Sequence, residues 1–504
     1  MKMRLTLLVL TIAAGVCTAS AQTIGGTSLE KTTAATAKIV LDEPIEELLE
    51  VFRQNSRARA ERFVRERLEE AMIEQSSEET LIEHILKISE QSGGFEPLAA
   101  TRPRENQIRL LARTRRGGRA IRIKILLSRK NAARLAAFEI EPDASATEKR
   151  VKQWPNLRLA EREAIAEIEE SAGRLAESDH LSGVLLVAKG DRILLHRSYG
   201  QMSRAARRPN RKDTIFPTAS MSKMFTAVAI AQLVERGALA LDDTLAIVLP
   251  DYPDRAAAER IKVRHLLAHR SGLGNFFNRE YRRDPARFTR PADYFPLFAN
   301  KPLFFEPGAK FSYSNAGMVV LGAIVERIGR RRFEDYLREN VFAPAGMKDT
   351  FYDPAAAPRG RLASLHTRFE TNDPLELEPR REKPDHRIAS PAGNSFTTAA
   401  DMLRFIRALQ KGKLVKRETL KLFTGAGEPP TADRYALGFE TELYGGRTGY
   451  GHSGGAPGVN ANAITLGDGD YTVVILSNYD PGFAQFFAAD AAALLANVPA
   501  REKK

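Results

Sequence analysis

Cysteine is almost absent from this chain of 504 residues, since it occurs once, as Cys17. A single cysteine cannot form an intrachain disulfide, and Cys17 lies in an N-terminal segment that we expect to be removed. The mature chain is therefore expected to contain no thiol and no disulfide. Its stability must come from apolar cores, for which the hydrophobic content of 43% is sufficient.

Long apolar runs are also scarce, and the one at the N-terminus is too short to span a membrane. Lys2 and Arg4 precede an apolar stretch over residues 5–16, and Ala19-Ser20-Ala21 offers a small-residue cleavage site. This pattern predicts a secretory signal peptide over residues 1–21, followed by a flexible segment over residues 22–42. We therefore expect an exported protein, periplasmic or extracellular. Lipidation of Cys17 is disfavoured because a bulky residue, Val16, precedes it.

Acidic residues are fewer than basic ones, and the formal net charge is +13 at pH 7. Loss of Lys2 and Arg4 with the signal peptide leaves +11. The basic clusters in residues 113–119 and 330–332 lie far apart and lack interleaved aromatic residues, so a nucleic-acid groove is not expected. Association with anionic cell-envelope polymers is compatible with this charge, although solubility alone also explains it. No pattern indicates an oligomeric state.

The spacing of apolar residues divides the rest of the chain into two parts. Residues 45–53, 57–73 and 77–91 repeat apolar positions at helical spacing, which predicts three helices. After Gly93-Gly94 the period becomes two, which predicts strands in four ranges, 95–99, 107–112, 120–127 and 134–140. Residues 43–141 are thus expected to form a small α+β domain, similar to cystatin-like or nuclear-transport-factor-like cones. Residues 142–155 are expected to be a linker.

The strongest chemical signal is Ser220-Met221-Ser222-Lys223, at the start of a long apolar run. Residues 221–234 are apolar almost all the way round, which predicts a helix buried in a sizeable domain. Side chains three residues apart share one face of a helix, so the Lys223 amine can reach the Ser220 hydroxyl. This pair predicts a nucleophile beside a base. The same spacing at Ser28 and Lys31 lies in a polar stretch without such a helix.

Two further motifs follow. Tyr313-Ser314-Asn315 lies between a Pro-Gly turn and an apolar helix predicted over residues 318–328, where Asn315 is a candidate helix cap. Residues 451–455, Gly-His-Ser-Gly-Gly, precede a hairpin predicted over residues 463–466 and 471–477. This second motif also fits the nucleophile elbow of α/β-hydrolases, which requires a helix directly after the serine. A hairpin follows instead, so Ser220 is favoured over Ser453 as the nucleophile.

In order and separation, these motifs resemble those of the β-lactamase-related serine hydrolases. This group includes class C β-lactamases, D-alanyl-D-alanine carboxypeptidases, D-amino-acid peptidases and β-lactamase-like esterases. Residues 265–273, 305–308 and 390–393 support the resemblance, with Arg270 in place of the usual threonine. The resemblance covers residues 156–498 and implies a two-lobed α+β catalytic domain. One lobe would be an antiparallel sheet flanked by helices, and the other would be helical.

The resemblance also implies a role for each site residue. Ser220 would attack a carbonyl and become acylated, Lys223 would act as the base, and Tyr313 would shuttle protons. The backbone N–H groups of Ser220 and Gly455 would form the oxyanion hole. His452 completes the catalytic set, and the substrate-binding set is Asn315, Ser453, Gly454 and Gly455. The segment 275–298, rich in Arg, Phe and Tyr, would form a rim that shapes specificity.

No cofactor or metal is expected. His265 and His269 have a spacing used by metal ligands on helices, but no Glu follows His265 and no third ligand is evident. Packing or hydrogen bonding is the favoured role for both.

His452 is a departure from most β-lactamases, which carry lysine at this position and use it to attract the carboxylate of the substrate. A neutral imidazole attracts anions less than an ammonium does. We therefore expect an ester, a D-amino peptide or a related amide to be a better substrate than a penicillin. Two alternatives stay open: a sensor that binds penicillins or peptidoglycan peptides with little turnover, and a genuine β-lactamase.

Overall fold

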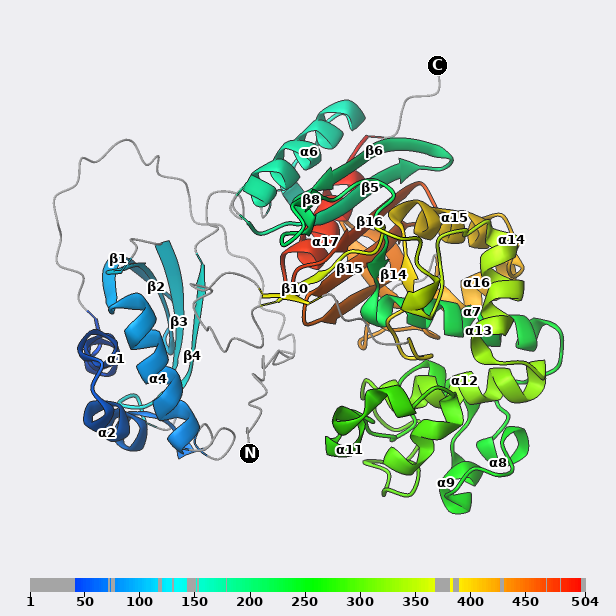
Figure 1. The fold of residues 1–504 in the computed structure, drawn as a ribbon, viewed down its shortest axis with the longest axis horizontal. Helices are drawn as coiled ribbons and strands as arrows, with labels where there is room; N and C mark the ends of the chain where they lie inside the picture. The colour runs from blue at the N-terminus through cyan, green and yellow to red at the C-terminus, as the bar shows by residue number, and fades with distance from the viewer. Residues whose placement is uncertain are drawn as a thin grey trace. The chain divides into compact units, whose positions relative to one another are not determined.

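The structure of the chain is a computed structural model. It describes residues 41–70, 73, 78–116, 120–128, 131–142, 151, 154–177, 179–367, 381–383, 389–426, 430–467, 469–480 and 482–499. These residues fall into two compact units, one ending at Pro142 and the other beginning at Val151 (Figure 1). The predicted signal peptide, residues 1–21, lies outside the described residues. Residues 22–40 of the predicted flexible segment also lie outside them.

The described part of the first unit consists of helices packed on an antiparallel sheet. Its helices are α1 (Glu43–Gln54), α2 (Arg57–Arg67) and α4 (Glu78–Ser92), and its strands are β1 (Phe95–Arg104), β2 (Gln107–Thr114), β3 (Ala120–Leu127) and β4 (Leu135–Pro142), paired in that order (Figure 1). Buried residues alternate along β2, because only one face of the sheet is covered. That face packs its isoleucines, such as Ile108 and Ile123, against Phe52 and Phe63 of the helices.

The first unit differs from the prediction at its second helix. We predict a helix over residues 57–73, but α2 ends at Arg67. Leu68 adopts an extended conformation, with φ −95° and ψ 147°, and forms a parallel bridge with Leu135 of β4. A backbone pairing with a residue far along the chain thus ends the helix. Local apolar spacing carries no information about such a partner.

The second unit is built around a six-stranded antiparallel sheet. Its strand order is β13-β14-β15-β16-β5-β6. The strands are β5 (Gly183–Lys189), β6 (Arg192–Tyr199), β13 (Glu440–Tyr444), β14 (Arg447–Ala456), β15 (Val459–Leu466) and β16 (Tyr471–Ser477). The register pairs Gly183 with Ser477 and Lys189 with Tyr471. The first and last strands of the unit are therefore neighbours, as the family resemblance implies.

Both faces of this sheet are buried. Val184 and Leu186 of β5 enter the larger core, which includes α7 (Lys223–Glu235) and α12 (Asn315–Gly329). Leu185 and Val187, which point the other way, pack with α6 (Glu161–Glu177) and α17 (Phe483–Ala496). This explains why the central strands read as continuous apolar runs rather than alternating ones.

The remaining helices of the second unit are short, apart from α15. They are α8 (Leu245–Val248), α9 (Arg255–Arg260), α10 (Val263–Leu267), α11 (Arg279–Arg283), α13 (Phe333–Leu337), α14 (Ala343–Ala345), α15 (Ala399–Gln410) and α16 (Arg417–Thr424). Short 3-10 helices are η1 (Trp154–Asn156), η2 (Ala219–Ser222), η3 (Pro285–Arg287), η4 (Pro291–Leu297) and η6 (Pro354–Ala356), and η5 (Arg338–Phe342) is a π-helix. Short strands are β7 (Gln201–Ser203), β8 (Arg208–Pro209), β9 (Phe216–Pro217), β10 (Leu365–Thr367), β11 (Arg381–Lys383) and β12 (Phe396–Thr397). Among the described helices, none combines the length and apolarity needed to cross a membrane.

The predicted linker, residues 142–155, includes a residue of the second core. Trp154 is 0% exposed and packs edge-on against Phe487, with ring centroids 5.4 Å apart. Its Nε1–H donates to the Glu167 carboxylate at 3.2 Å. A lone tryptophan in a polar, proline-containing stretch does not indicate which core it enters, because its partners lie elsewhere in the chain.

Candidate active site

Ser220 and Lys223 lie where a short turn meets a buried helix. β9 leads into the 3-10 turn η2, and α7 begins at Lys223. We predict Ser220 in the first turn of an α-helix, whereas the structure places it in η2. Side chains three residues apart eclipse one another in a 3-10 turn, so the two groups still share a face. Lys223 Nζ lies 2.9 Å from Ser220 Oγ.

The turn depends on an uncommon backbone conformation at Ala219. Its φ of 44° lies in the left-handed region, which non-glycine residues rarely adopt. The Ala219 carbonyl oxygen accepts hydrogen bonds from the Ser222 hydroxyl at 2.8 Å and from the Asn394 N–H at 2.9 Å. Ser222 also accepts a hydrogen bond from the Ser395 N–H at 3.1 Å. These bonds hold the strained residue that presents Ser220.

Lys223 is completely buried, and this changes its chemistry. The side chain is 0% exposed and donates to the Ala392 carbonyl oxygen at 2.5 Å. Burial lowers the pKa of Lys223 to about 7, and the negative charge of Glu440 opposes this shift. An amine with this pKa is partly uncharged at neutral pH. It can therefore accept a proton from a neighbouring hydroxyl.

Tyr313 lies directly over this pair. It precedes Ser314, the N-cap of α12, and the Lys223 Nζ is 4.8 Å from the centre of its ring. Tyr313 is 36% exposed as a residue, yet the groups packed around it raise the pKa of its phenol, while interaction with the Ser220 side chain opposes the rise. The phenol stays protonated at neutral pH and can donate a proton close to Ser220.

Asn315 begins α12 but does not cap it. The Ser314 hydroxyl oxygen accepts a hydrogen bond from the Gly317 N–H at 3.0 Å, so Ser314 is the cap. Asn315 Nδ2 donates instead to Asn275 Oδ1 at 2.9 Å. This bond joins α12 to the predicted rim segment 275–298. A role for Asn315 in substrate binding stays a prediction.

His452, Ser453, Gly454 and Gly455 all lie within strand β14, which pairs directly with β15 of the predicted hairpin. This strand runs against η2. A Cβ atom at Gly454 would lie 2.1 Å from the Thr218 carbonyl oxygen and 3.1 Å from the Met221 N. Only glycine permits this approach, which brings the strand beside Ser220.

His452 is buried and held by both of its ring nitrogens. It is 1% exposed, and its Nδ1 lies 2.6 Å from the Ser453 carbonyl oxygen. Because a carbonyl oxygen only accepts, Nδ1 carries the proton, and Nε2 accepts from the Tyr435 hydroxyl at 2.9 Å. Burial and the nearby Lys223 lower the pKa of His452, while Glu440 opposes this. His452 is thus neutral at pH 7 and tied to Tyr435 rather than to Ser220.

Ser453 is not placed as a nucleophile. Its hydroxyl donates to Glu440 Oε1 and its backbone N–H donates to Glu440 Oε2, both at 2.8 Å. No helix follows it, because β14 continues to Ala456 and β15 begins at Val459. This arrangement lacks the strand-turn-helix geometry of a nucleophile elbow.

Sequence reasoning missed Tyr435 and Glu440, whereas the packing or hydrogen-bonding role that it gave His269 agrees with the structure. The His269 ring lies between Tyr313 and Tyr435, with centroids 4.3 Å and 4.5 Å away. Its Nδ1 accepts a hydrogen bond from the Ser314 N–H at 3.2 Å, so it orients the Tyr313 loop. The only available signal was that Tyr435 and Glu440 precede the glycine-rich motif in a strand-like stretch. Glu440 reaches Ser453 through the pairing of β13 with β14, and Tyr435 is linked to Glu440 by a β-bridge.

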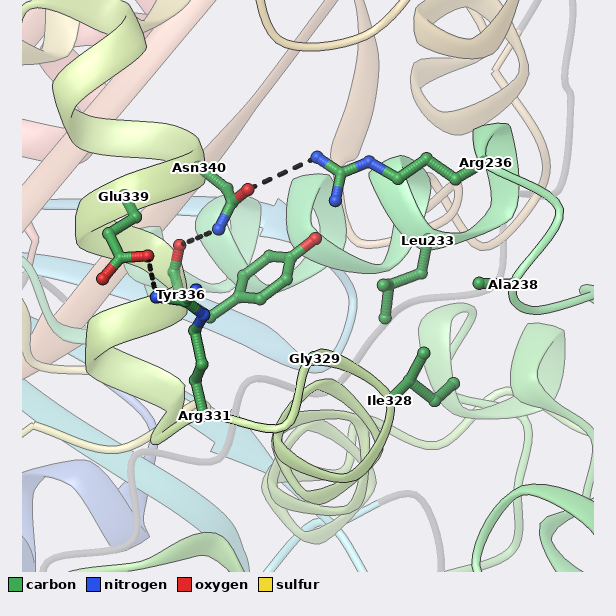
Figure 2. A pocket seen from close by; sticks show the side chains of 9 residues that line it. All are labelled: Leu233, Arg236, Ala238, Ile328, Gly329, Arg331, Tyr336, Glu339 and Asn340. Atoms are coloured by element: carbon green, nitrogen blue, oxygen red, sulfur yellow. Dashed lines mark hydrogen bonds and ion pairs between the residues drawn. The ribbon is translucent and has the colours of Figure 1, made fainter.

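A separate cavity of about 320 Å³ lies at the far end of α7 (Figure 2). It is lined by Leu233, Arg236, Ala238, Ile328, Gly329, Arg331, Tyr336, Glu339 and Asn340. None of these is a predicted site residue, and Lys223 lies at the opposite end of the helix. In the described ranges, no group of three or more His, Cys, Asp and Glu side chains is arranged to hold a metal ion.

Comparison with known proteins gives the family. Residues 165–497 match the model of the Beta-lactamase family, which is more than half of the chain. The chain belongs to the beta-lactamase family. The match lies within the region 156–498 that the motifs indicate, so the predicted family is confirmed, and the chain is a β-lactamase-related serine hydrolase.

Individual relatives agree with this family. Penicillin-binding protein 4* of Bacillus subtilis (strain 168) is 29% identical over 320 residues, which cover 60% of this chain and 69% of the relative. Esterase EstB of Burkholderia gladioli is 30% identical over 305 residues, which cover 55% of this chain and 76% of the relative. The crystal structure of a penicillin binding protein from Bacillus halodurans superposes with a TM-score of 0.55 at 30% identity, covering 64% of this chain and 97% of that one. The predicted α+β fold of the β-lactamase/transpeptidase type is therefore confirmed.

Proposed function

We propose that this protein is an exported hydrolase that forms an acyl-enzyme at Ser220, with Lys223 as the base. The observation that carries the proposal is the buried Lys223 amine, 2.9 Å from the Ser220 hydroxyl and with a pKa lowered to about 7. A hydroxyl is a weak nucleophile on its own and needs an adjacent base that is uncharged at working pH. The substrate would be an ester, a D-amino peptide or a related amide.

The reaction would proceed in two steps. Neutral Lys223 takes the Ser220 proton as Oγ bonds to the substrate carbonyl carbon, and the backbone N–H groups of Ser220 and Gly455 bind the oxyanion. Collapse breaks the bond to the leaving group, which receives a proton through Tyr313. Water then gives a proton to the same base and attacks the acyl-enzyme. The acid is released and the Ser220 hydroxyl is restored.

The surroundings of His452 support esters and amides over penicillins. His452 is neutral, and its ring nitrogens are engaged by Tyr435 and by the Ser453 carbonyl oxygen. It therefore supplies no positive charge for a substrate carboxylate. One relative is named an esterase and two are named penicillin-binding proteins, so the second candidate function is a sensor that is acylated by penicillin and deacylates slowly.

A direct test combines covalent labelling with turnover. The mature chain is treated with a fluorophosphonate and digested, and the labelled peptide is identified by mass spectrometry. We expect the label on Ser220 and none on Ser220→Ala, while Ser453→Ala serves as the matched control and still labels. Labelling of Ser220→Ala would overturn Ser220 as the nucleophile.

Kinetics then separate the two candidate functions. We expect p-nitrophenyl acetate to be hydrolysed with a higher kcat/KM than benzylpenicillin. Stable acylation by penicillin without ester turnover would favour the sensor, and a clear preference for penicillin would favour a β-lactamase.

Export is tested with the N-terminal segment. Residues 1–42 are fused to alkaline phosphatase, which folds into an active enzyme only outside the reducing cytoplasm. We expect an active fusion and cleavage after residue 21. A fusion that stays uncleaved and inactive would contradict export.

A further inference from the structure

Glu440 is a carboxylate at the edge of the candidate active site, and the proposed mechanism does not use it. It begins β13, and its two oxygens accept the backbone N–H and the hydroxyl of Ser453, both at 2.8 Å. Oε1 also lies 3.4 Å from His452 Nδ1. The side chain is 39% exposed, so the carboxylate is fixed by the protein on one side and open to solvent on the other.

Glu440 forms no ion pair with a lysine or an arginine among the residues that the structure describes. In the part of the chain that the structure describes, its one ion-pair contact is with His452, a group that is neutral at pH 7. Two nearby carboxylates have such a partner: Glu442, also on β13, pairs with Arg434, and Asp470, in the turn between β15 and β16, pairs with Arg447. The Glu440 charge is therefore left to act on a substrate group that approaches Ser453.

The position of Glu440 relative to the reacting atoms follows from the sheet register. β13 pairs with β14 only as far as Glu440 opposite Gly451, so no described strand covers the outer edge of β14 beyond that point. The Ser453 N–H points to the outer edge of β14, where it donates to Glu440. Backbone N–H groups of alternate residues point to the same edge of a strand, so the Gly455 N–H points to this outer edge as well. Two residues of a strand span about 7 Å. The carboxylate is thus about that far from the proposed oxyanion site.

The contacts of Glu440 also indicate which side of the substrate it faces. Tyr313 is the proposed proton donor to the leaving group, and the ring centroids of Tyr313 and His452 are 6.5 Å apart. Glu440 touches His452, and its charge acts on both Lys223 and Tyr313. If Tyr313 protonates the leaving group as proposed, these contacts place the carboxylate toward the leaving-group side of the substrate.

We propose that Glu440 is a specificity residue that excludes substrates with a carboxylate on the leaving group and favours neutral or cationic leaving groups. This inference rests on the proposed function. A substrate carboxylate placed here would meet a fixed like charge, and it would find both Ser453 donors already occupied. An ammonium at the same place would gain an ion pair. Peptides with a free C-terminus at this position are expected to be poor substrates, whereas esters and amides with an amine-bearing leaving group are expected to be good ones.

The test uses three phenyl acetates that share a meta substituent position and differ in charge. The substituents are carboxylate, carbamoyl and trimethylammonio. We expect kcat/KM of the wild type to be at least about tenfold higher for the cation than for the anion at low salt. Glu440→Gln keeps the shape of the side chain and its ability to form hydrogen bonds but removes its charge. It should reduce this cation-to-anion ratio about tenfold. Added salt should reduce the wild-type ratio as well.

Glu442→Gln is the matched control, because it removes a carboxylate two residues along the same strand. It should leave the cation-to-anion ratio unchanged. A wild-type ratio near one, or an equal change of all three substrates in Glu440→Gln, would overturn the role of Glu440. Failure to hydrolyse even the carbamoyl ester would instead contradict the proposed function, so the two failures are distinguishable.

Discussion

The two units of this protein bury polar side chains of different kinds. In the described residues of the first unit, the buried polar side chains are hydroxyls, namely Ser89, Ser92, Thr114 and Ser128. The second unit also buries ionisable groups: His366 and Asp401 are buried elsewhere in it, and Lys223, His269 and His452, each 0–1% exposed, lie together. These three groups surround one ring, Tyr313. Burying such groups opposes folding, so their concentration in one place marks a site that serves chemistry rather than stability.

Backbone strain shows the same contrast. Ala219, His269 and Asn394 have positive φ values of 44°, 55° and 72°, and all three contact the site. In the described residues of the first unit, Asn55 is the non-glycine residue with positive φ, and it ends a helix. Strain at a helix end is a common way to stop a helix, whereas strain beside a nucleophile requires the surrounding packing to maintain it. Four experiments test this division between the units.

The largest expected effect comes from Lys223→Met. We expect kcat/KM for esters to fall at least about a thousandfold, because the base is lost. The second unit should become more stable at pH 7 by roughly 1–3 kcal/mol, because a buried amine that binds protons weakly is removed. Trp154 is the only tryptophan and lies in this unit, so its fluorescence in urea reports the change.

The pH dependence of that stability gain provides the control. The folded-state pKa of Lys223 is about 7 and the ordinary value is 10.5, so the unfolded chain binds more protons between these values. Wild-type stability should therefore rise with pH across this window, and the advantage of Lys223→Met should vanish near pH 10. An equal advantage at pH 7 and pH 10 would contradict the lowered pKa.

Gly454→Ala should have the next largest effect. Its Cβ would overlap the Thr218 carbonyl oxygen, so β14 must move away from η2 and carry the Gly455 N–H with it. A displaced oxyanion donor typically costs about a hundredfold in kcat. Gly173→Ala is the control, because its Cβ meets nothing within 4 Å and it lies in α6. If Gly454→Ala kept wild-type kinetics, the contact between strand and turn would be irrelevant to catalysis.

The ester kcat/KM of the wild type should rise about tenfold between pH 6 and pH 8. With the pKa of Lys223 at about 7, roughly one-tenth of the amine is uncharged at pH 6 and roughly nine-tenths at pH 8. Ester kcat/KM should rise between these values and then level off. Glu440→Gln should move the midpoint downward, since the Glu440 charge raises the pKa of Lys223. A profile that rises only near pH 10 would mean that Lys223 is not desolvated.

Ile123→Ala should have the smallest effect on catalysis. Ile123 is 0% exposed in the sheet of the first unit, and its truncation should destabilise that unit by about 2–4 kcal/mol. Faster hydrogen exchange over residues 107–127 would report this, while ester kcat/KM should stay within about twofold. Val473→Ala, at an equivalent buried position in β16, should instead lower the urea concentration at which the Trp154 fluorescence reports unfolding of the second unit. A large loss of activity in Ile123→Ala would show that the first unit takes part in catalysis.

The prediction succeeded where the signal is local. Apolar spacing located α1, α4, β2, β3 and β4 to within a few residues, although β1 continues to Arg104, past its predicted end at residue 99, and the predicted hairpin appears as β15 and β16. It was wrong where a distant partner decides the outcome, as at Leu68, which pairs with Leu135, and it did not indicate that Trp154 enters the second core. It also missed Glu440, since a carboxylate at the start of a strand has no distinguishing pattern until the neighbouring strand is placed.

The sequence by itself determined the family, the two-part organisation and the spacing that allows Ser220 and Lys223 to meet, because these depend on residues close together in the chain or on ordered motifs. Only the tertiary structure decided that Lys223 is buried, with its pKa lowered to about 7. It alone placed Gly454 against Thr218 and Glu440 against Ser453. The physical reason is that desolvation and charge interactions depend on which distant segments pack together, and no local pattern encodes that packing.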